Sequence, residues 1–215
     1  MCHEGQRNIT TLKNELWVAA GGYHEGAFPA KTIAIPDGVG LYGGFLGNEV
    51  LRDARNPSAH PTVIEGDLPN DLGNACHVVT LAGNVTLSGF VIANGDARGQ
   101  IEADGGGIVV TGGAPTIDHC VFRGHRADYG AAVAVLGGTP SFSDNHYDAD
   151  NRAAALGSCT YVATGASVEA TGDVLNLPFS RRLVGSVGRD FSPGDLGSDS
   201  ASVASRRSNR PHGLA

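Results

Sequence analysis

Four charged residues in the second half of the chain have the types and spacing that could act on a polymer: Asp118, Arg123, Asp144 and Asp148. They fall in two segments that repeat one another, because a shift of about 25 residues brings Arg123 onto Asp148. Carboxylates that share a cleft can act as general acid and base or hold a cation. If these side chains face solvent together, they form a substrate-binding patch. The alternative is that outward charges keep an elongated protein soluble.

Three histidines lie close in sequence to this patch and raise the question of a metal site. His119, His125 and His146 could approach one another across two repeats, but their spacing matches no standard ligand motif. The alternative is that His119 and His125 occupy corners and hydrogen-bond to the backbone. We favour the corner interpretation and expect no required metal.

A polar insertion follows the first repeat and contains Asp96, Arg98, Glu102 and Asp104. Acidic loops on repeat proteins can bind calcium. The glycine run that follows, at residues 105–107, lacks the GGxGxD pattern of calcium-binding repeats. We therefore expect an exposed acidic loop and no cofactor.

Two further residue types have both a chemical and a packing interpretation. Cys120 recurs at an inward position, which favours a buried small apolar residue over a nucleophile. Trp17 and Tyr42 could line a sugar site, or they could pack the first repeats and their cap.

The composition excludes several classes of protein. Glycine supplies 32 of 215 residues without a Gly-X-Y period, so a collagen triple helix is excluded. The net charge is -7 with only 15 basic residues, so a nucleic-acid partner is not expected. The four cysteines form no CxxC pair, and no run of 18 apolar residues is present. We expect no zinc site, no membrane span and no visible signal peptide.

Short β-rich runs separated by glycine or proline recur from residue 16 to residue 136. Residues 105–117 align with residues 130–142, and residues 86–92 continue the same apolar pattern about 30 residues earlier. Units of 20 to 30 residues that contain only short strands are typical of a parallel β-solenoid, in which each unit is one coil. Equivalent large residues would then stack inside, in two columns: Leu87, Ile117 and Phe142, and Ile92, Phe122 and Tyr147.

Residues 15–23, 40–49 and 62–67 occur in the order of a known family. They resemble the opening strand, the early turn and the following strand of right-handed parallel β-helix proteins related to polymorphic outer-membrane protein repeats. These proteins belong to the wider pectin-lyase-like architecture. The resemblance covers roughly residues 14–151 and implies an all-β, single-stranded right-handed parallel β-helix with a flexible C-terminal tail.

The repeat signatures suggest where the helix begins and ends. His125 and Asp150 stand where the family has asparagine, and the polar Asn145 at an inward position predicts that regular coiling weakens just before residue 151. We expect a lead-in or cap at residues 1–13, the β-helix at 14–151 and an irregular last coil or cap at 152–172. Residues 173–215 are predicted to form the flexible tail, because residues 188–215 have too little apolar content to offset the entropy of ordering.

The resemblance implies two kinds of function. One is a non-catalytic extracytoplasmic or cell-surface protein that binds glycan or another surface polymer on its outer face, and we favour this one. The alternative is a polysaccharide lyase or glycoside hydrolase of the pectin-lyase-like group, with Asp118, Arg123, Asp144 and Asp148 in its groove. Because members of the family are usually longer and secreted, the resemblance also implies an extracellular location and a truncated chain.

Overall fold

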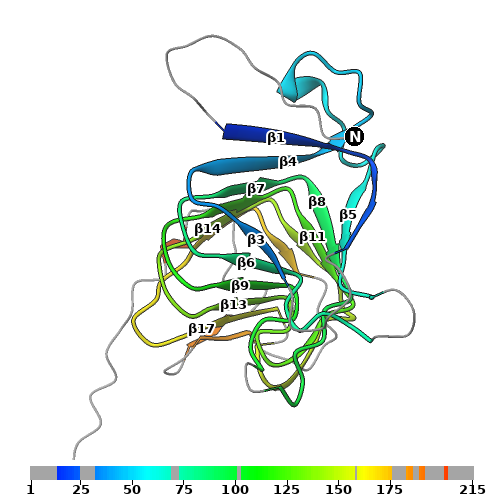
Figure 1. Cartoon of the computed structure of the whole chain (residues 1–215). Helices are drawn as coiled ribbons and strands as arrows, with labels where there is room; N and C mark the ends of the chain where they lie inside the picture. The colour runs from blue at the N-terminus through cyan, green and yellow to red at the C-terminus, as the bar shows by residue number, and fades with distance from the viewer. Residues whose placement is uncertain are drawn as a thin grey trace, which may run out of the picture.

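The chain folds almost entirely into β-strands and turns, as a computed structural model shows (Figure 1). The structure describes residues 14–24, 32–68, 73–100, 103–157, 159–175, 183–185, 189–191 and 201–202. A single 3-10 turn, η1 (Arg52–Ala54), is the helical element of these residues. The predicted lead-in at 1–13 and most of the predicted tail lie outside the described residues.

Three parallel sheets form the walls of the molecule. Sheet A contains β1 (Asn14–Ala19), β4 (Val39–Phe45), β7 (Thr86–Ser88), β10 (Thr116–Asp118), β14 (Ser141–Ser143), β18 (Glu169–Thr171) and, antiparallel to β18, β22 (Ala201–Ser202). Sheet B contains β2 (Gly21–Tyr23), β5 (Thr62–Glu65), β8 (Phe90–Ala93), β11 (Val121–Arg123), β15 (His146–Tyr147) and β19 (Val174–Leu175). Sheet C contains β3 (Ile33–Ile35), β6 (Val79–Leu81), β9 (Ile108–Val110), β13 (Val133–Val135) and β17 (Thr160–Val162). Two further pairs are β12 (Arg126–Tyr129) with β16 (Arg152–Leu156), which is parallel, and β20 (Leu183–Gly185) with β21 (Arg189–Phe191), which is antiparallel.

Each coil of the chain visits sheets A, B and C in turn, so the molecule is a right-handed parallel β-helix of about five turns. The register confirms the repeat found in the sequence. Ile117 pairs with Leu87 on one side and Phe142 on the other, and Phe122 pairs in the same way with Ile92 and Tyr147. The predicted fold class is therefore correct.

The core lies between the three sheets and consists of columns of equivalent residues. Leu87 and Ile117 are completely buried and Phe142 is 3% exposed. The rings of Phe122 and Tyr147 stack with centroids 4.9 Å apart. Each of these large side chains contributes about 1.5–3 kcal/mol by leaving water, so stacking coil on coil stabilises the helix without any helical layer.

The corner between sheets A and B has a left-handed backbone conformation in the four coils that lead from β7, β10, β14 and β18 into sheet B. The corner residues are Gly89, His119, Asp144 and Gly172, with φ of 77°, 52°, 54° and 68°. Glycine adopts this conformation easily, whereas histidine and aspartate pay a conformational cost. The side chains of His119 and Asp144 therefore stand at positions where the fold alone would favour glycine.

Asn145 strengthens the stacking of coils, contrary to the sequence interpretation that it weakens coiling. Its side chain accepts a hydrogen bond from Cys120 N and donates one to Ile117 O, both at 2.9 Å. Asn151 does the same one corner further on, between His125 N and Phe122 O. Buried amides satisfied on both sides join neighbouring coils, and parallel pairing continues past residue 151 to β18 and β19.

Candidate functional site

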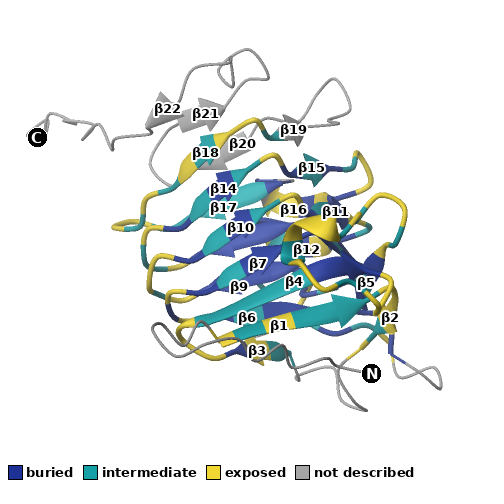
Figure 2. Cartoon of the chain, turned by 90° about the horizontal axis from the view of Figure 1, so that it is seen from above, coloured by how far each residue is buried: buried dark blue, intermediate teal, exposed yellow. Residues whose placement is uncertain are grey.

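The outer face of sheet A presents two rows of short polar side chains in register. Strands β4, β7, β10 and β14 lie side by side there (Figure 2). One row contains Thr86, Thr116 and Ser141, and the next contains Ser88, Asp118 and Ser143. Alternation along each strand sends Leu87, Ile117 and Phe142 inward and these residues outward. The hydroxyls of Ser141 and Thr116 are 3.4 Å apart and hydrogen-bonded.

An aromatic and charged group closes the N-terminal end of this face. The Tyr42 ring lies over Gly40, where a Cβ atom would come within 2.8 Å of the ring. The guanidinium groups of Arg52 and Arg55 lie 4.9 Å and 5.3 Å from the centroid of the same ring. Arg52 also donates to Glu15 at 3.0 Å and to the Tyr42 hydroxyl at 3.3 Å. Cation–π contacts and an ion pair thus hold η1 against the sheet.

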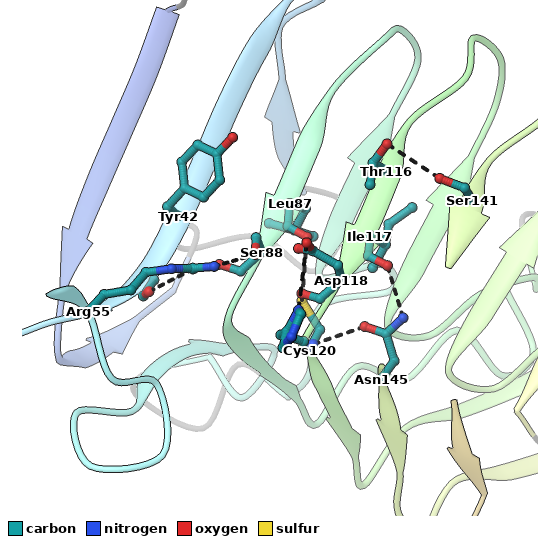
Figure 3. Close-up of polar contacts among 12 residues, drawn as sticks. Tyr42, Arg55, Leu87, Ser88, Thr116, Ile117, Asp118, Cys120, Ser141 and Asn145 are labelled. Carbon is teal, nitrogen blue, oxygen red and sulfur yellow. Dashed lines mark hydrogen bonds and ion pairs between the residues drawn. The ribbon is translucent and has the colours of Figure 1, made fainter. Parts of the chain in front are cut away.

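Arg55 reaches from this loop across to β7 (Figure 3). Its guanidinium donates to Gly43 O at 3.1 Å, Ser88 O at 2.9 Å and Ser88 Oγ at 2.7 Å. Gly89 provides the space for this guanidinium, because a Cβ atom at residue 89 would lie 2.6 Å from Arg55 Nη1. Burial lowers the pKa of Arg55, and the negative charge of Asp118 opposes that shift.

Asp118 is the charged residue at the centre of the face. Its Oδ1 is buried without a hydrogen-bond partner, although 26% of the side chain is exposed. Its Oδ2 lies 3.6 Å from Nδ1 of His119, whose side chain is 59% exposed. Figure 3 places Asp118 next to Ser88 on the neighbouring strand. The exposed part of this carboxylate can accept a hydrogen bond from a ligand, whereas Oδ1 is enclosed by the protein.

The four predicted substrate-binding residues lie at two edges of sheet B. Asp118 and Asp144 lie at or beside the corner with sheet A, whereas Arg123 ends β11 and Asp148 follows β15. Within the described residues, no hydrogen bond or ion pair joins any two of the four. Asp148 instead lies 3.0 Å from Nε2 of His146. The register that relates Arg123 to Asp148 is as expected from the sequence, and the role of the patch stays a prediction.

The three histidines differ in environment. His125 is completely buried, with Nδ1 accepting from Gly95 N at 3.1 Å and Nε2 donating to Ile92 O at 2.9 Å. Burial lowers the pKa of His125 to about 4, so the ring is neutral at pH 7, as the corner interpretation requires. His119 also occupies a corner, as predicted, but its exposed ring lies beside Asp118 where the interpretation expected a hydrogen bond to the backbone. In the described part of the chain, no group of three or more His, Cys, Asp or Glu side chains is placed to hold a metal ion.

The acidic insertion before β9 contains one ion pair and one carboxyl group with a raised pKa. Asp96 forms an ion pair with Arg98 at 2.6 Å. Burial raises the pKa of Asp104, the neighbouring Asp128 raises it further, and His77 opposes the shift. Glu102 lies outside the described residues.

Cys120 packs as a small apolar residue, in agreement with the sequence interpretation. It is 1% exposed, and burial raises the pKa of its thiol to about 12. The thiol donates to Leu87 O and Asp118 O at 3.6 Å and 3.3 Å. A thiol that stays protonated at pH 7 is a poor nucleophile.

Sequence reasoning missed Arg55 and the hydroxyl rows. Arg55 lies in the non-repeating segment between β4 and β5, and its partner Ser88 is 33 residues away. No local pattern marks such a contact. The hydroxyl rows could have been found, because the alignment that revealed the inward columns also places Thr116 on Ser141.

Fold and site together define a right-handed parallel β-helix with one polar, hydroxyl-bearing outer sheet face. Residues 8–204 match the family model described as "Protein of unknown function (DUF1565)", and the chain belongs to this family, whose members are right-handed β-helices. No curated protein and no solved structure matches the chain. Within the described residues, no helix is long and apolar enough to span a membrane.

Proposed function

We propose that this protein is a non-catalytic module that binds an extended glycan along the outer face of sheet A. The observation that carries this proposal is the in-register hydroxyl row of Thr86, Thr116 and Ser141, with the partly exposed Asp118 and Ser143 beside it. Ser88 of the second row is completely buried beneath Arg55. Coils stack about 4.8 Å apart, so the rows offer donors and acceptors at a regular spacing. Hydroxyl side chains both donate and accept, which suits the hydroxyl groups of a sugar chain.

The character of the face supports a glycan over other polymers. Thr116, Ser141 and Ser143 are partly exposed and small, so a flat ligand can approach the strands. Protein partners are usually held by buried aromatic and aliphatic anchors, whereas the apolar residues of these strands point into the core. The chain's charge of -7 opposes a nucleic acid.

Binding to a panel of soluble glucans, mannans, xylans and galacturonans tests this proposal, with dissociation constants measured by titration calorimetry. The double variant Thr116→Val/Ser141→Ala removes two hydroxyls and keeps the shape of the face. At about 1 kcal/mol for each lost hydrogen bond, binding should weaken about tenfold or more. Thr80→Val on sheet C is the matched control and should bind as the wild type does. Equal affinity of all three proteins would contradict the proposal.

The alternative function is cleavage of a polysaccharide, and the Asp118–His119 pair favours it. A partly exposed carboxylate beside an exposed imidazole is one arrangement for acid–base chemistry. Release of reducing ends or unsaturated products from the same panel, lost in Asp118→Asn, would establish an enzyme. If the protein binds glycan and releases no product, the non-catalytic proposal stands.

An extracytoplasmic or cell-surface location is part of the proposal, and what supports it is the resemblance to secreted β-helix proteins. Fractionation of the source cells, with the protein followed by antibody, tests it. Recovery with the cytosol would contradict it.

A further inference from the structure

We infer that the outer face of sheet A selects uncharged glycans and rejects polyuronates. This inference rests on the proposed function and names the chemical class of its ligand. It follows from the distribution of charge over the coils that carry the hydroxyl rows.

Carboxylates that form no ion pair with arginine or lysine among the described residues recur on three successive coils, on this face and at its corner with sheet B, although the charge of Arg55 acts on Asp118. Asp118 ends β10 and lies beside His119, Asp144 occupies the next corner, and Glu169 begins β18. Glu169 pairs in register with Ser141, so it extends the first hydroxyl row. The side chains of Asp144 and Glu169 are exposed, and neither forms an ion pair among the described residues.

The two guanidinium groups at the N-terminal end of this face, those of Arg52 and Arg55, already have hydrogen-bond partners within the protein. Arg52 pairs with Glu15 at 3.0 Å and also donates to the Tyr42 hydroxyl. Arg55 donates to two backbone carbonyls and to Ser88 Oγ. A uronate that recruited either group would have to share it with these acceptors, which already take up part of its charge and of its hydrogen-bonding capacity.

A neutral sugar and a uronate differ in what they can offer these carboxylates. A sugar hydroxyl can donate a hydrogen bond to Asp118, Asp144 or Glu169, and bonds to an ionised acceptor are strong. An ionised uronate group only accepts hydrogen bonds and carries the same charge. Each uronate placed over these coils therefore loses a donor and adds repulsion, which salt screens.

The test compares matched oligosaccharides that differ in charge and share a backbone. One pair is fully methyl-esterified oligogalacturonides and the same oligomers after saponification. The second is cello-oligosaccharides and their C6-carboxylated counterparts. Titration calorimetry at pH 7.5 in 20 mM salt should show the neutral member of each pair binding about tenfold tighter than the charged member. The ratio of the two dissociation constants should be smaller in 300 mM salt, which screens the repulsion.

Variants distinguish selection by this face from a general effect of the protein's negative charge. Asp144→Asn/Glu169→Gln should reduce the neutral-to-acidic ratio several-fold, and asparagine tolerates the corner conformation of residue 144. Asp128→Asn removes one carboxylate near Asp104, away from sheet A, and should leave the ratio unchanged.

The outcomes separate this inference from the proposed function. If the uronate member binds as tightly as its neutral counterpart or tighter, the inference is overturned and glycan binding stands. If Asp128→Asn changes the neutral-to-acidic ratio as much as Asp144→Asn/Glu169→Gln does, the selection does not come from sheet A and the inference is also overturned. Binding of neither member of either pair, nor of the wider panel, overturns the proposed function and this inference with it.

Discussion

The parallel strands of sheet A from β7 to β18 have the same length as the strands of sheet C, but the outer faces of the two sheets differ. On sheet A the outward residues Thr116 and Ser141 remain partly exposed. On sheet C the outward residues Val109 and Ala134 are 5% and 0% exposed. The turn at Gly105 covers them, because a Cβ atom there would lie 2.7 Å from Val109 and 3.0 Å from Ala134. At β9 and β13 the outer face of sheet C is therefore part of the packed structure, although Thr80 and Tyr161 in the same row remain partly exposed. At β10 and β14 the outer face of sheet A is available to a ligand.

The difference shows that alternation along a strand does not decide which outer face can function. Alternation only divides residues between inside and outside. Whether an outward residue meets solvent depends on loops that return over the sheet, and in this protein the turn at Gly105, in the connection from β8 to β9, covers part of sheet C. The short corners from sheet A to sheet B after β10 and β14 leave this part of sheet A open, whereas the longer connection from β4 to β5 carries Arg55 over the buried Ser88 of β7.

The largest expected effect comes from placing a charge on each face in turn. Ala134→Asp buries a carboxylate without a partner under the Gly105 turn and should lower the free energy of unfolding by about 3 kcal/mol or more. Ser141→Asp places the same charge on the open face and should change it by less than about 1 kcal/mol. Urea denaturation measures the free energy of unfolding of both variants. Equal losses would show that residues 134 and 141 do not differ in how far the protein buries them.

The second prediction concerns the ring behind the covering turn, since Gly107 packs against His125. The pKa of His125 is about 4 in the folded protein, whereas the ordinary pKa of a histidine, expected in the unfolded chain, is 6.5. The contribution of the neutral His125 ring to the free energy of unfolding is complete above pH 6.5. It is lost as the pH falls towards 4, because the unfolded chain binds the proton more readily than the folded protein does. This loss amounts to about 3 kcal/mol.

Comparison with His125→Gln isolates this contribution. The variant should be less stable at pH 7, and the difference from the wild type should shrink by about 3 kcal/mol between pH 7 and pH 4. Asp173, whose pKa burial raises to about 6, stabilises the fold as the pH falls from 6 towards 4, but equally in both proteins. A stability difference that does not change with pH would contradict the buried, neutral state of His125.

The third prediction sharpens the comparison at the corner beside sheet A. His119→Gly relieves a positive φ of 52° but adds flexibility to the unfolded chain. Thermal unfolding should therefore show a change within about 1 kcal/mol. Binding of a neutral glycan should nevertheless weaken, because the partner of Asp118 is lost. A strongly destabilised variant would mean that His119 serves the fold instead.

The smallest effect is expected at the far edge of sheet B. Arg123→Ala/Asp148→Ala removes two of the four residues that the sequence assigned to one patch. Because they lie across sheet B from the hydroxyl rows, glycan affinity should stay within about twofold, a difference below 0.5 kcal/mol. A tenfold loss would move the binding surface to sheet B.

The sequence predicted what repeats and missed what does not. Columns such as Leu87, Ile117 and Phe142 follow from residue type at a fixed spacing, so fold and register were accessible. The role of Asn145 was misjudged, because a buried amide destabilises only when it is unpaired, and its partners come from the preceding coil. Arg55 could not be placed, since its bonds join a non-repeating loop to β7.

An NMR titration of the labelled protein with a neutral oligosaccharide from the panel tests the central claim most directly. The account predicts that the shifted amide signals cluster in β7, β10 and β14 and at His119 and Asp144, and that β9 and β13 of sheet C stay unchanged. Shifts centred on sheet C or on the far edge of sheet B would contradict the assignment of function to the outer face of sheet A.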